Sequence, residues 1–380
     1  MMNGRRPHWG AMIVVAGVVS GCGGGSGDGS GETVERSSTT TRPSIVAGGN
    51  VNLITGADAR KAIAPEDFHF YDMQGFRAFW HHSYANSSLK LLISAIGPKK
   101  LLDHLESFRT TTQDPDARTA AAQFIELIHA AYTSYGSVDT HAFIVGLQKL
   151  APFNKRNAAG EWEFKLDSDV FSKEQDPQQF LALFSELFRL DTLPGWSFDL
   201  DETYVHQGQE RAHKREKSRF QMFQPIDLGR IRPEDVARLN LQKIVDLLHA
   251  QDEAQIRWND ADTAPTTVQV IRQVSIPDAE NFDRLTISLQ GTLAGATTLS
   301  IKGAVTLPAV DQKTGKKLLL TLRPKEIVAW ANSRYSIRIK NHELEWMKHS
   351  ESSVLPAESG DDKDNAQLVN FAVTNIVPAP

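Results

Sequence analysis

Ser83 directly follows two histidines, His81 and His82, so a hydroxyl and two imidazoles stand together in the sequence. A serine hydroxyl attacks only when a base takes its proton, and histidine is the side chain that most often does so. Neighbours on one chain seldom form such a pair, because the base usually comes from another part of the fold. A hydrolase that uses Ser83 therefore stays open as an alternative whose base has still to be identified.

Cys22 is the only cysteine of the chain. A disulfide within the chain and a thiolate-rich zinc site are therefore excluded. A catalytic cysteine is excluded as well unless it is Cys22, and its Gly- and Ser-rich surroundings do not look like an active site. We expect no cofactor and no metal site, because the acidic stretch Glu358 to Asp364 reads as a solvated loop. His342 and His349 are expected to be surface or turn histidines.

The amino terminus has the pattern of an export signal. Arg5 and Arg6 precede an apolar stretch, Ala11 to Val19, which is far shorter than the roughly 20 residues of a membrane span. Val19-Ser20-Gly21-Cys22 follows and resembles the bacterial lipobox. The resemblance implies cleavage before Cys22 and a lipid on its sulfur. An ordinary secretory signal with a chance cysteine is the alternative.

These features predict a signal peptide over residues 1–21, a lipidated flexible linker over 22–64 and a globular domain over 65–380. The linker is predicted because Gly, Ser and Thr dominate the stretch that follows Cys22. The predicted location is the bacterial cell envelope, with the chain anchored to a membrane and either periplasmic or displayed at the surface. Which membrane and which face are not evident from the sequence.

The composition is that of a globular protein with 41% hydrophobic and 23% charged residues. The net charge of -5 argues against bulk nucleic-acid binding, which usually needs a basic domain or stripe. One short basic run, His213 to Lys217, is predicted to be solvated surface rather than a lipid or phosphate contact.

The periodicity of apolar residues predicts helices first and strands later. Helical spacing occurs in four stretches: Leu89 to Ile96, Phe124 to Ile128, Phe180 to Leu187 and Leu241 to Leu248. Alternation typical of half-buried strands follows: Val268 to Ile276, Leu285 to Leu289, Tyr335 to Ile339 and Val369 to Val373. This order indicates an α+β fold with antiparallel strands. Lys313 to Lys316 is predicted to be a turn.

Three segments share residues with known sequence boxes. Residues 75–89 read G-F-R-A-F-W-H-H-S-Y-A-N-S-S-L, residues 174–181 read E-Q-D-P-Q-Q-F-L, and Tyr335 is followed after a turn by W-M-K-H-S-E-S-S-V over residues 346–354. They resemble, in order, the cysteine box of ubiquitin-specific proteases (G-L-x-N-x-G-N-T-C-Y-M-N-S-x-L-Q), their Q-Q-D-A-x-E-F-L segment, and their final box (G-H-Y-x-A-Y, then W-Y-x-F-[ND]-D-x-x-V).

The resemblance runs from about Phe68 to Val373. It implies a papain-like fold with a helical thumb and an antiparallel β palm. The zinc-binding cysteines of the family's fingers are absent, so reduced, metal-free fingers are implied near Thr203 to Thr267. An unrelated α+β domain with chance matches is the alternative. On physical grounds Asp176 and Pro177 suit the N-cap and first turn of a helix.

The resemblance places unusual residues at the catalytic positions. The nucleophile position is Ser83, the base position is Arg334, the position that orients the base is Ser350, and the oxyanion-donor position is Ala78. An arginine keeps its proton and cannot act as a base. An alanine methyl group donates nothing, and losing one oxyanion donor typically costs about 100- to 1000-fold in rate. Four such changes together indicate a natural pseudoenzyme rather than a peptidase.

A papain-like cleft that lacks the catalytic groups predicts a binding module. The resemblance implies substrate-binding positions at Gln175, Asp176 and Tyr335, and ubiquitin, a ubiquitin-like protein or another extended peptide as the partner. The bulky Trp80, where the family has glycine, argues against the usual passage of a diglycine tail. A bacterial envelope protein is therefore ranked equally as partner. The sequence also leaves open an active peptidase with a non-standard nucleophile and a structural envelope lipoprotein.

Overall fold

The computed structural model describes residues 73–77, 82–134, 137–147, 150–154, 176–193, 195–196, 198–213, 224–228, 231, 240–249, 251–259, 263–290, 303–331, 334–340, 345–349, 354–357 and 365–379. Two compact units divide the chain, residues 1–49 and residues 50–380, and all described residues belong to the second. Cys22, and with it the predicted signal and most of the linker, lies outside the described residues.

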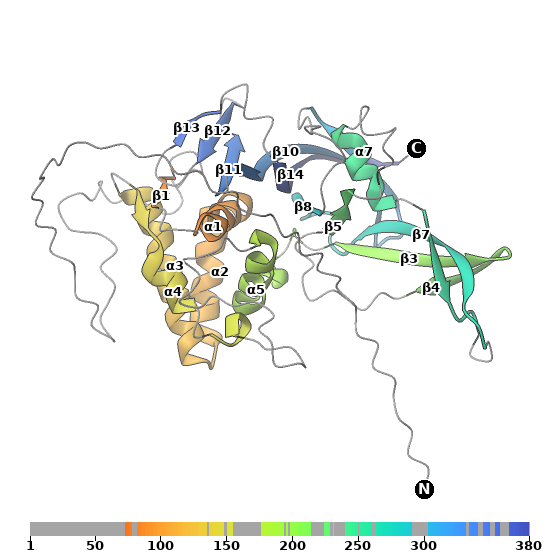
Figure 1. Cartoon of the computed structure of the whole chain (residues 1–380), viewed down its shortest axis with the longest axis horizontal. Coiled ribbons are helices and arrows are strands. Elements are labelled where there is room, and N and C mark those ends of the chain that lie inside the picture. The colour runs from red at the N-terminus through yellow and green to blue at the C-terminus, as the bar shows by residue number, and fades with distance from the viewer. Residues whose placement is uncertain are drawn as a thin grey trace, which may run out of the picture. The chain divides into compact units, whose positions relative to one another are not determined.

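Helices dominate the first half of the described unit and strands dominate the second (Figure 1). The helices are α1 (Ser83–Ile96), α2 (Pro98–Thr111), α3 (Pro115–Thr133), α4 (His141–Leu147), α5 (Pro177–Phe188) and α7 (Leu241–Asp246), with short 3-10 turns η3 (Ala151–Asn154), η5 (Leu190–Thr192) and η7 (Leu247–His249). The first strands are β1 (Phe76–Arg77), β2 (Val138–Asp139), β3 (Asp199–His206), β4 (Gln209–His213), β5 (Gln224–Asp227) and β6 (Asp252–Ile256). The later ones are β7 (Thr266–Ile276), β8 (Arg284–Gln290), β9 (Val305–Asp311), β10 (Lys317–Ala331), β11 (Arg334–Lys340), β12 (Trp346–His349), β13 (Val354–Pro356) and β14 (Asn365–Pro378).

The predicted helices form where the apolar spacing placed them, and local signals explain their ends. Gly97 has φ 87° at the end of α1, and Pro98 then opens α2, so these two residues end one helix and begin the next. Asp114 caps α3 by accepting hydrogen bonds from the backbone N–H groups of Asp116 and Ala117. The turn predicted over Lys313 to Lys316 joins β9 to β10.

Within the described residues, twelve strands form one sheet in the order β13-β12-β11-β10-β9-β7-β3-β4, while β14, β8, β5 and β6 pair beside this path. Most neighbours are antiparallel, as predicted. The parallel pairs β7–β9 and β5–β8 are exceptions, and each of them joins strands that are not consecutive in the chain. A separate two-residue parallel pair, β1–β2, lies beside the helices. The sheet is therefore mixed.

Two hydrophobic cores cover opposite faces of the sheet. Val328 on β10 and its partner Leu368 on β14 belong to the core that contains the helices α1 to α5. Their neighbours Ile327 and Val369 belong to the core that contains α7. Successive residues of a strand point to opposite faces, so this stretch of β10 and β14 separates the two cores. Helix α1 packs on β10 and β11 (Figure 1).

Gly195 is a position that should accept no side chain. Its φ is +85°, and a Cβ there would lie 2.2 Å from the carbonyl oxygen of Asn281. We expect Gly195→Ala to lower the free energy of unfolding by about 3 kcal/mol, because it adds a clash with backbone to an unfavourable conformation. Gly208→Ala is the control, since its φ is +76° with open space around the Cβ. Denaturant titrations that give equal losses for both variants would refute the steric explanation.

Candidate functional site

The structure brings Ser83 and the start of β11 into direct contact, although 252 positions separate them. Ser83 is the first residue of α1, and its Oγ accepts a hydrogen bond of 2.7 Å from the backbone N–H of Tyr335. Ser83 is 2% exposed, whereas Arg334, the residue before Tyr335, is exposed. The positions that the resemblance assigns to nucleophile and base therefore lie at one place, where the helices meet the sheet.

Polar contacts hold the first turn of α1 against the β1–β2 pair. Asn86 donates through Nδ2 to the carbonyl oxygen of Arg77 at 3.3 Å and accepts through Oδ1 from the hydroxyl of Thr140 at 2.6 Å. The rings of His82 and His141 stack with centroids 5.5 Å apart. His82 is 1% exposed and occupies the N-cap, without a side-chain hydrogen bond to the cap. The start of α1, and with it Ser83, is thereby fixed in position.

Asp176 caps α5, as the sequence predicts. Its Oδ1 accepts a hydrogen bond of 2.8 Å from the backbone N–H of Gln178. Burial raises the pKa of the Asp176 carboxyl, and the hydrogen bonds from the backbone N–H groups of Gln178 and Gln179 partly oppose that rise. The hydroxyl of Ser88 on α1 donates to the carbonyl oxygen of Pro177 at 3.3 Å and ties the two helices together. Asp176 is therefore a structural cap, and its predicted binding role stays a prediction.

Lys90 and His349 are a buried basic pair that the sequence did not predict. Each is 2% exposed, so the expectation that His349 is a surface or turn histidine was wrong. His349 lies opposite Ile337 in the β11–β12 register, and Ile337 belongs to the core with the helices, so His349 faces α1. Burial lowers the pKa of Lys90 to about 7, and its Nζ lies 5.4 Å from the centroid of the Phe76 ring. Burial and the nearby Lys90 charge lower the pKa of His349 to about 3.

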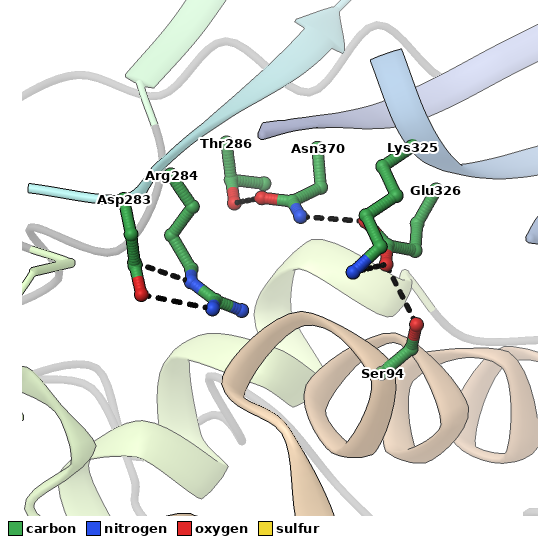
Figure 2. A network of polar contacts seen from close by, with 7 residues as sticks. All are labelled: Ser94, Asp283, Arg284, Thr286, Lys325, Glu326 and Asn370. Atoms are coloured by element: carbon green, nitrogen blue, oxygen red, sulfur yellow. Dashed lines mark hydrogen bonds and ion pairs between the residues drawn. The ribbon is translucent and has the colours of Figure 1, made fainter. Parts of the chain in front are cut away.

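A buried carboxylate, Glu326, connects α1 to the sheet (Figure 2). It is fully buried on β10 and accepts hydrogen bonds from the Ser94 hydroxyl at 2.6 Å and from Nδ2 of Asn370 at 2.7 Å. Asn370 in turn accepts a 2.7 Å hydrogen bond from the Thr286 hydroxyl. Nζ of Lys325 lies 3.8 Å from the carboxylate. The chain of contacts spans α1, β10, β14 and β8 and holds the helical layer in register with the sheet.

Several predicted residues lie outside the described part of the chain. They are Ala78, Ser350, Gln175, Cys22, His81, Trp80 and His342. Within the described residues, no group of three or more His, Cys, Asp or Glu side chains is arranged to hold a metal ion. Among the same residues, no helix is both long and apolar enough to cross a membrane.

The described part of the site brings a hydroxyl, a cation and two aromatic rings to one region. The Ser83 hydroxyl oxygen faces a backbone donor, and the exposed neighbour Arg334 is a cation that cannot remove its proton. Half-buried aromatic rings lie beside this place: those of Trp330 and Tyr335 are 4.6 Å apart and come from paired positions of β10 and β11. A cation, a buried hydroxyl and two aromatic rings can bind an anionic or peptide-like group.

No protein-family model and no curated protein sequence matches the chain. Solved structures match it in fold. One is the SAGA DUB module Ubp8/Sgf11/Sus1/Sgf73 bound to monoubiquitin, with TM-score 0.53 and 13% sequence identity over 80% of this chain and 70% of that chain. Another is the SAGA Ubp8/Sgf11/Sus1/Sgf73 DUB module bound to ubiquitin aldehyde, with TM-score 0.50, 13% identity and the same coverage of 80% and 70%. The chain therefore has a ubiquitin-specific-protease-like fold of mixed helices and sheet.

Proposed function

We propose that this protein is a catalytically inactive relative of ubiquitin-specific proteases that binds a polypeptide and does not cleave it. The contact between Ser83 and Tyr335 supports the proposal, because Tyr335 directly follows the exposed Arg334, and the resemblance assigns Ser83 and Arg334 to the nucleophile and the base. Cysteine proteolysis needs a thiolate, a base and oxyanion donors. The residues at these positions are a serine, an arginine and Ala78, and none of them supplies the required group.

In this proposal the helices α1 to α5 act as the thumb and the sheet around β10, β11 and β14 acts as the palm. Strands β3, β4, β6 and β7 act as fingers that need no zinc. The polypeptide approaches Ser83 along the outer boundary between the helices and the sheet, with Tyr335, Asp176 and Gln175 near its path. Ubiquitin is a candidate partner because both matched modules are bound to ubiquitin or ubiquitin aldehyde. A ubiquitin-like protein and a bacterial envelope protein are the remaining candidates.

The proposal includes the cell envelope as the location. Cys22 would carry the lipid after removal of residues 1–21, and residues 22–64 would form the tether of the domain over 65–380. A lipoprotein beyond the inner membrane meets ubiquitin only where the bacterium contacts a eukaryotic cell. In the absence of such contact the partner is an envelope protein.

Cleavage and binding assays on one sample test this function. The sample is the full-length chain with Cys22→Ser, which takes no lipid. We expect no release of fluorophore from a fluorogenic ubiquitin substrate above the buffer rate, and saturable heat when ubiquitin is titrated by calorimetry. Turnover that disappears in Ser83→Ala would overturn the pseudoenzyme and establish the serine hydrolase instead. Absence of both signals would remove ubiquitin as partner and leave the envelope proteins.

A further inference from the structure

We propose that the side chain of Gln242 on α7 takes the place of a neighbouring strand at the open edge of β9, so that this edge cannot pair with β9 of a second copy of the chain. The contacts between α7 and β9 carry this inference, which is independent of the proposed function. It gives a role to a helix that lies outside the proposed thumb, palm strands and fingers.

One edge of β9 has little strand pairing among the described residues. On one side β10 pairs with β9 from Val305 to Val310, whereas on the other side β7 reaches β9 only at Val310 and Asp311. Thr306 and Pro308, which precede this short contact, are exposed. The stretch from Val305 to Val310 contains no charged side chain. An uncharged, exposed edge rich in β-branched residues is the kind of edge that pairs with another chain.

The side chain of Gln242 satisfies the backbone of Thr306 at this edge. The backbone N–H of Thr306 donates to Oε1 of Gln242 at 2.8 Å, and Nε2 of Gln242 donates to the carbonyl oxygen of Thr306 at 2.8 Å. A neighbouring strand would supply the same two bonds to one residue. Nε2 also donates to Oδ1 of Asp246, one turn further along α7, at 2.7 Å. The second bond holds the amide in the orientation that Thr306 requires.

The other outward positions of this edge are also closed to a new strand. In an antiparallel strand the backbone groups of alternate residues face opposite edges, so Pro308 and Val310 face the same way as Thr306. Pro308 has no N–H to donate. Val310 lies beside its partner Ser275 on β7. Of the three outward positions, one is bonded to Gln242, one lacks the donor and one is covered by β7.

The position of α7 depends on more than Gln242. Ile244 and Val245 of α7 are buried in the same core as Leu307 of β9. Directly after α7, Nδ1 of His249 lies 3.2 Å from the carbonyl oxygen of Arg272 on β7. The segment from α7 to η7 therefore contacts the backbone of both strands beside the point where they meet. Loss of the Gln242 amide should open the edge of β9 and leave the helix in place.

Amide hydrogen exchange and light scattering on the full-length chain with Cys22→Ser test this inference. Gln242→Leu keeps a similar volume and removes the amide. We expect the Thr306 amide to exchange about tenfold faster in this variant, while the Leu307 amide, which faces β10, keeps its rate. Pro308→Thr restores an outward N–H. The double variant Gln242→Leu/Pro308→Thr should show a mass that rises with concentration above that of the parent, whereas each single variant should match the parent.

Gln255→Leu on β6 is the matched control, because Gln255 is exposed and its Nε2 donates to a side chain, the Thr267 hydroxyl, at 3.3 Å. It should change neither the exchange of the Thr306 amide nor the mass. Unchanged exchange of Thr306 in Gln242→Leu would overturn the inference. Equal acceleration at Leu307 would also overturn it, because it would indicate general loosening of the sheet. A double variant that keeps the mass of the parent at every concentration would show that another feature closes this edge.

Discussion

Lys90→Met is expected to raise the free energy of unfolding at pH 7 by about 3 to 5 kcal/mol. Burial in the core lowers the pKa of Lys90 to about 7 from its ordinary value of 10.5. The folded protein must therefore hold an amine whose charged form is disfavoured, while the unfolded chain solvates that charge freely. A methionine fills a similar volume and carries no such cost.

The sign of the pH dependence follows from the lowered pKa. Between pH 7 and 10.5 the unfolded state holds the Lys90 proton more often than the folded state, so the stability of the parent protein rises with pH. The advantage of Lys90→Met should be largest at pH 7 and below and should vanish towards pH 10.5. His349 does not interfere in this window, because its pKa of about 3 keeps it neutral in the folded state.

Chemical denaturation between pH 7 and 10 measures this prediction. Lys99→Met on α2 is the matched control, since 59% of the Lys99 side chain is exposed and burial costs it little. Its stability should stay within about 0.5 kcal/mol of the parent at every pH. An unchanged pH slope in Lys90→Met would show that another group titrates, and a loss of stability at pH 7 would contradict the cost assigned to burial.

Asn370→Ala is expected to lower the free energy of unfolding by about 3 kcal/mol. The substitution removes the 2.7 Å hydrogen bond to the buried carboxylate of Glu326 and leaves the Thr286 hydroxyl without its 2.7 Å acceptor (Figure 2). Both groups are buried, so water does not replace the lost partner. The lost stability comes from the hydrogen bonds that connect the helical layer to the sheet.

Asn281→Ala provides the matched control for this loss. Asn281 also donates from Nδ2 to a carboxylate, that of Asp278 at 2.7 Å, but on an exposed surface. Its removal should cost about 0.5 kcal/mol. A double-mutant cycle of Asn370→Ala with Ser94→Ala should be non-additive, because both side chains donate to Glu326. A loss below about 1 kcal/mol for Asn370→Ala, measured by urea denaturation, would contradict the importance given to this network.

The sequence predicted those helices and strands in which apolar residues recur at a regular spacing. The apolar spacing in α1, α3 and α5 and the alternation in β7, β8 and β11 are local patterns, and the structure confirms the elements there. The cap at Asp176 and the turn before β10 also follow from neighbouring residues alone. The parallel β7–β9 and β5–β8 pairs could not be predicted this way, because strand direction depends on connections between distant segments.

The polar interior of the molecule could not be predicted from the sequence for the same reason. Lys90 and Ser94 are the polar residues in the otherwise apolar second half of α1, residues 89–96, which was a weak local signal. Their partners, His349 and Glu326, lie more than 200 positions away. His349 was misjudged because the sequence does not reveal which face of β12 it occupies. The contact of Ser83 with the start of β11 was foreseen only through the family resemblance, which placed both positions in one site.

Amide chemical shifts during a titration with ubiquitin test the central claim most directly. The backbone N–H of Tyr335 donates to Ser83, so its signal reports on the contact between α1 and β11 in the proposed site. Binding without cleavage predicts progressive, saturable shifts of Tyr335 and its neighbours in β11, and a fusion of ubiquitin to a reporter peptide that stays uncleaved when it is added to the same sample. Shifts confined to residues far from Ser83 and β11, or release of the reporter peptide from that fusion, would contradict the claim.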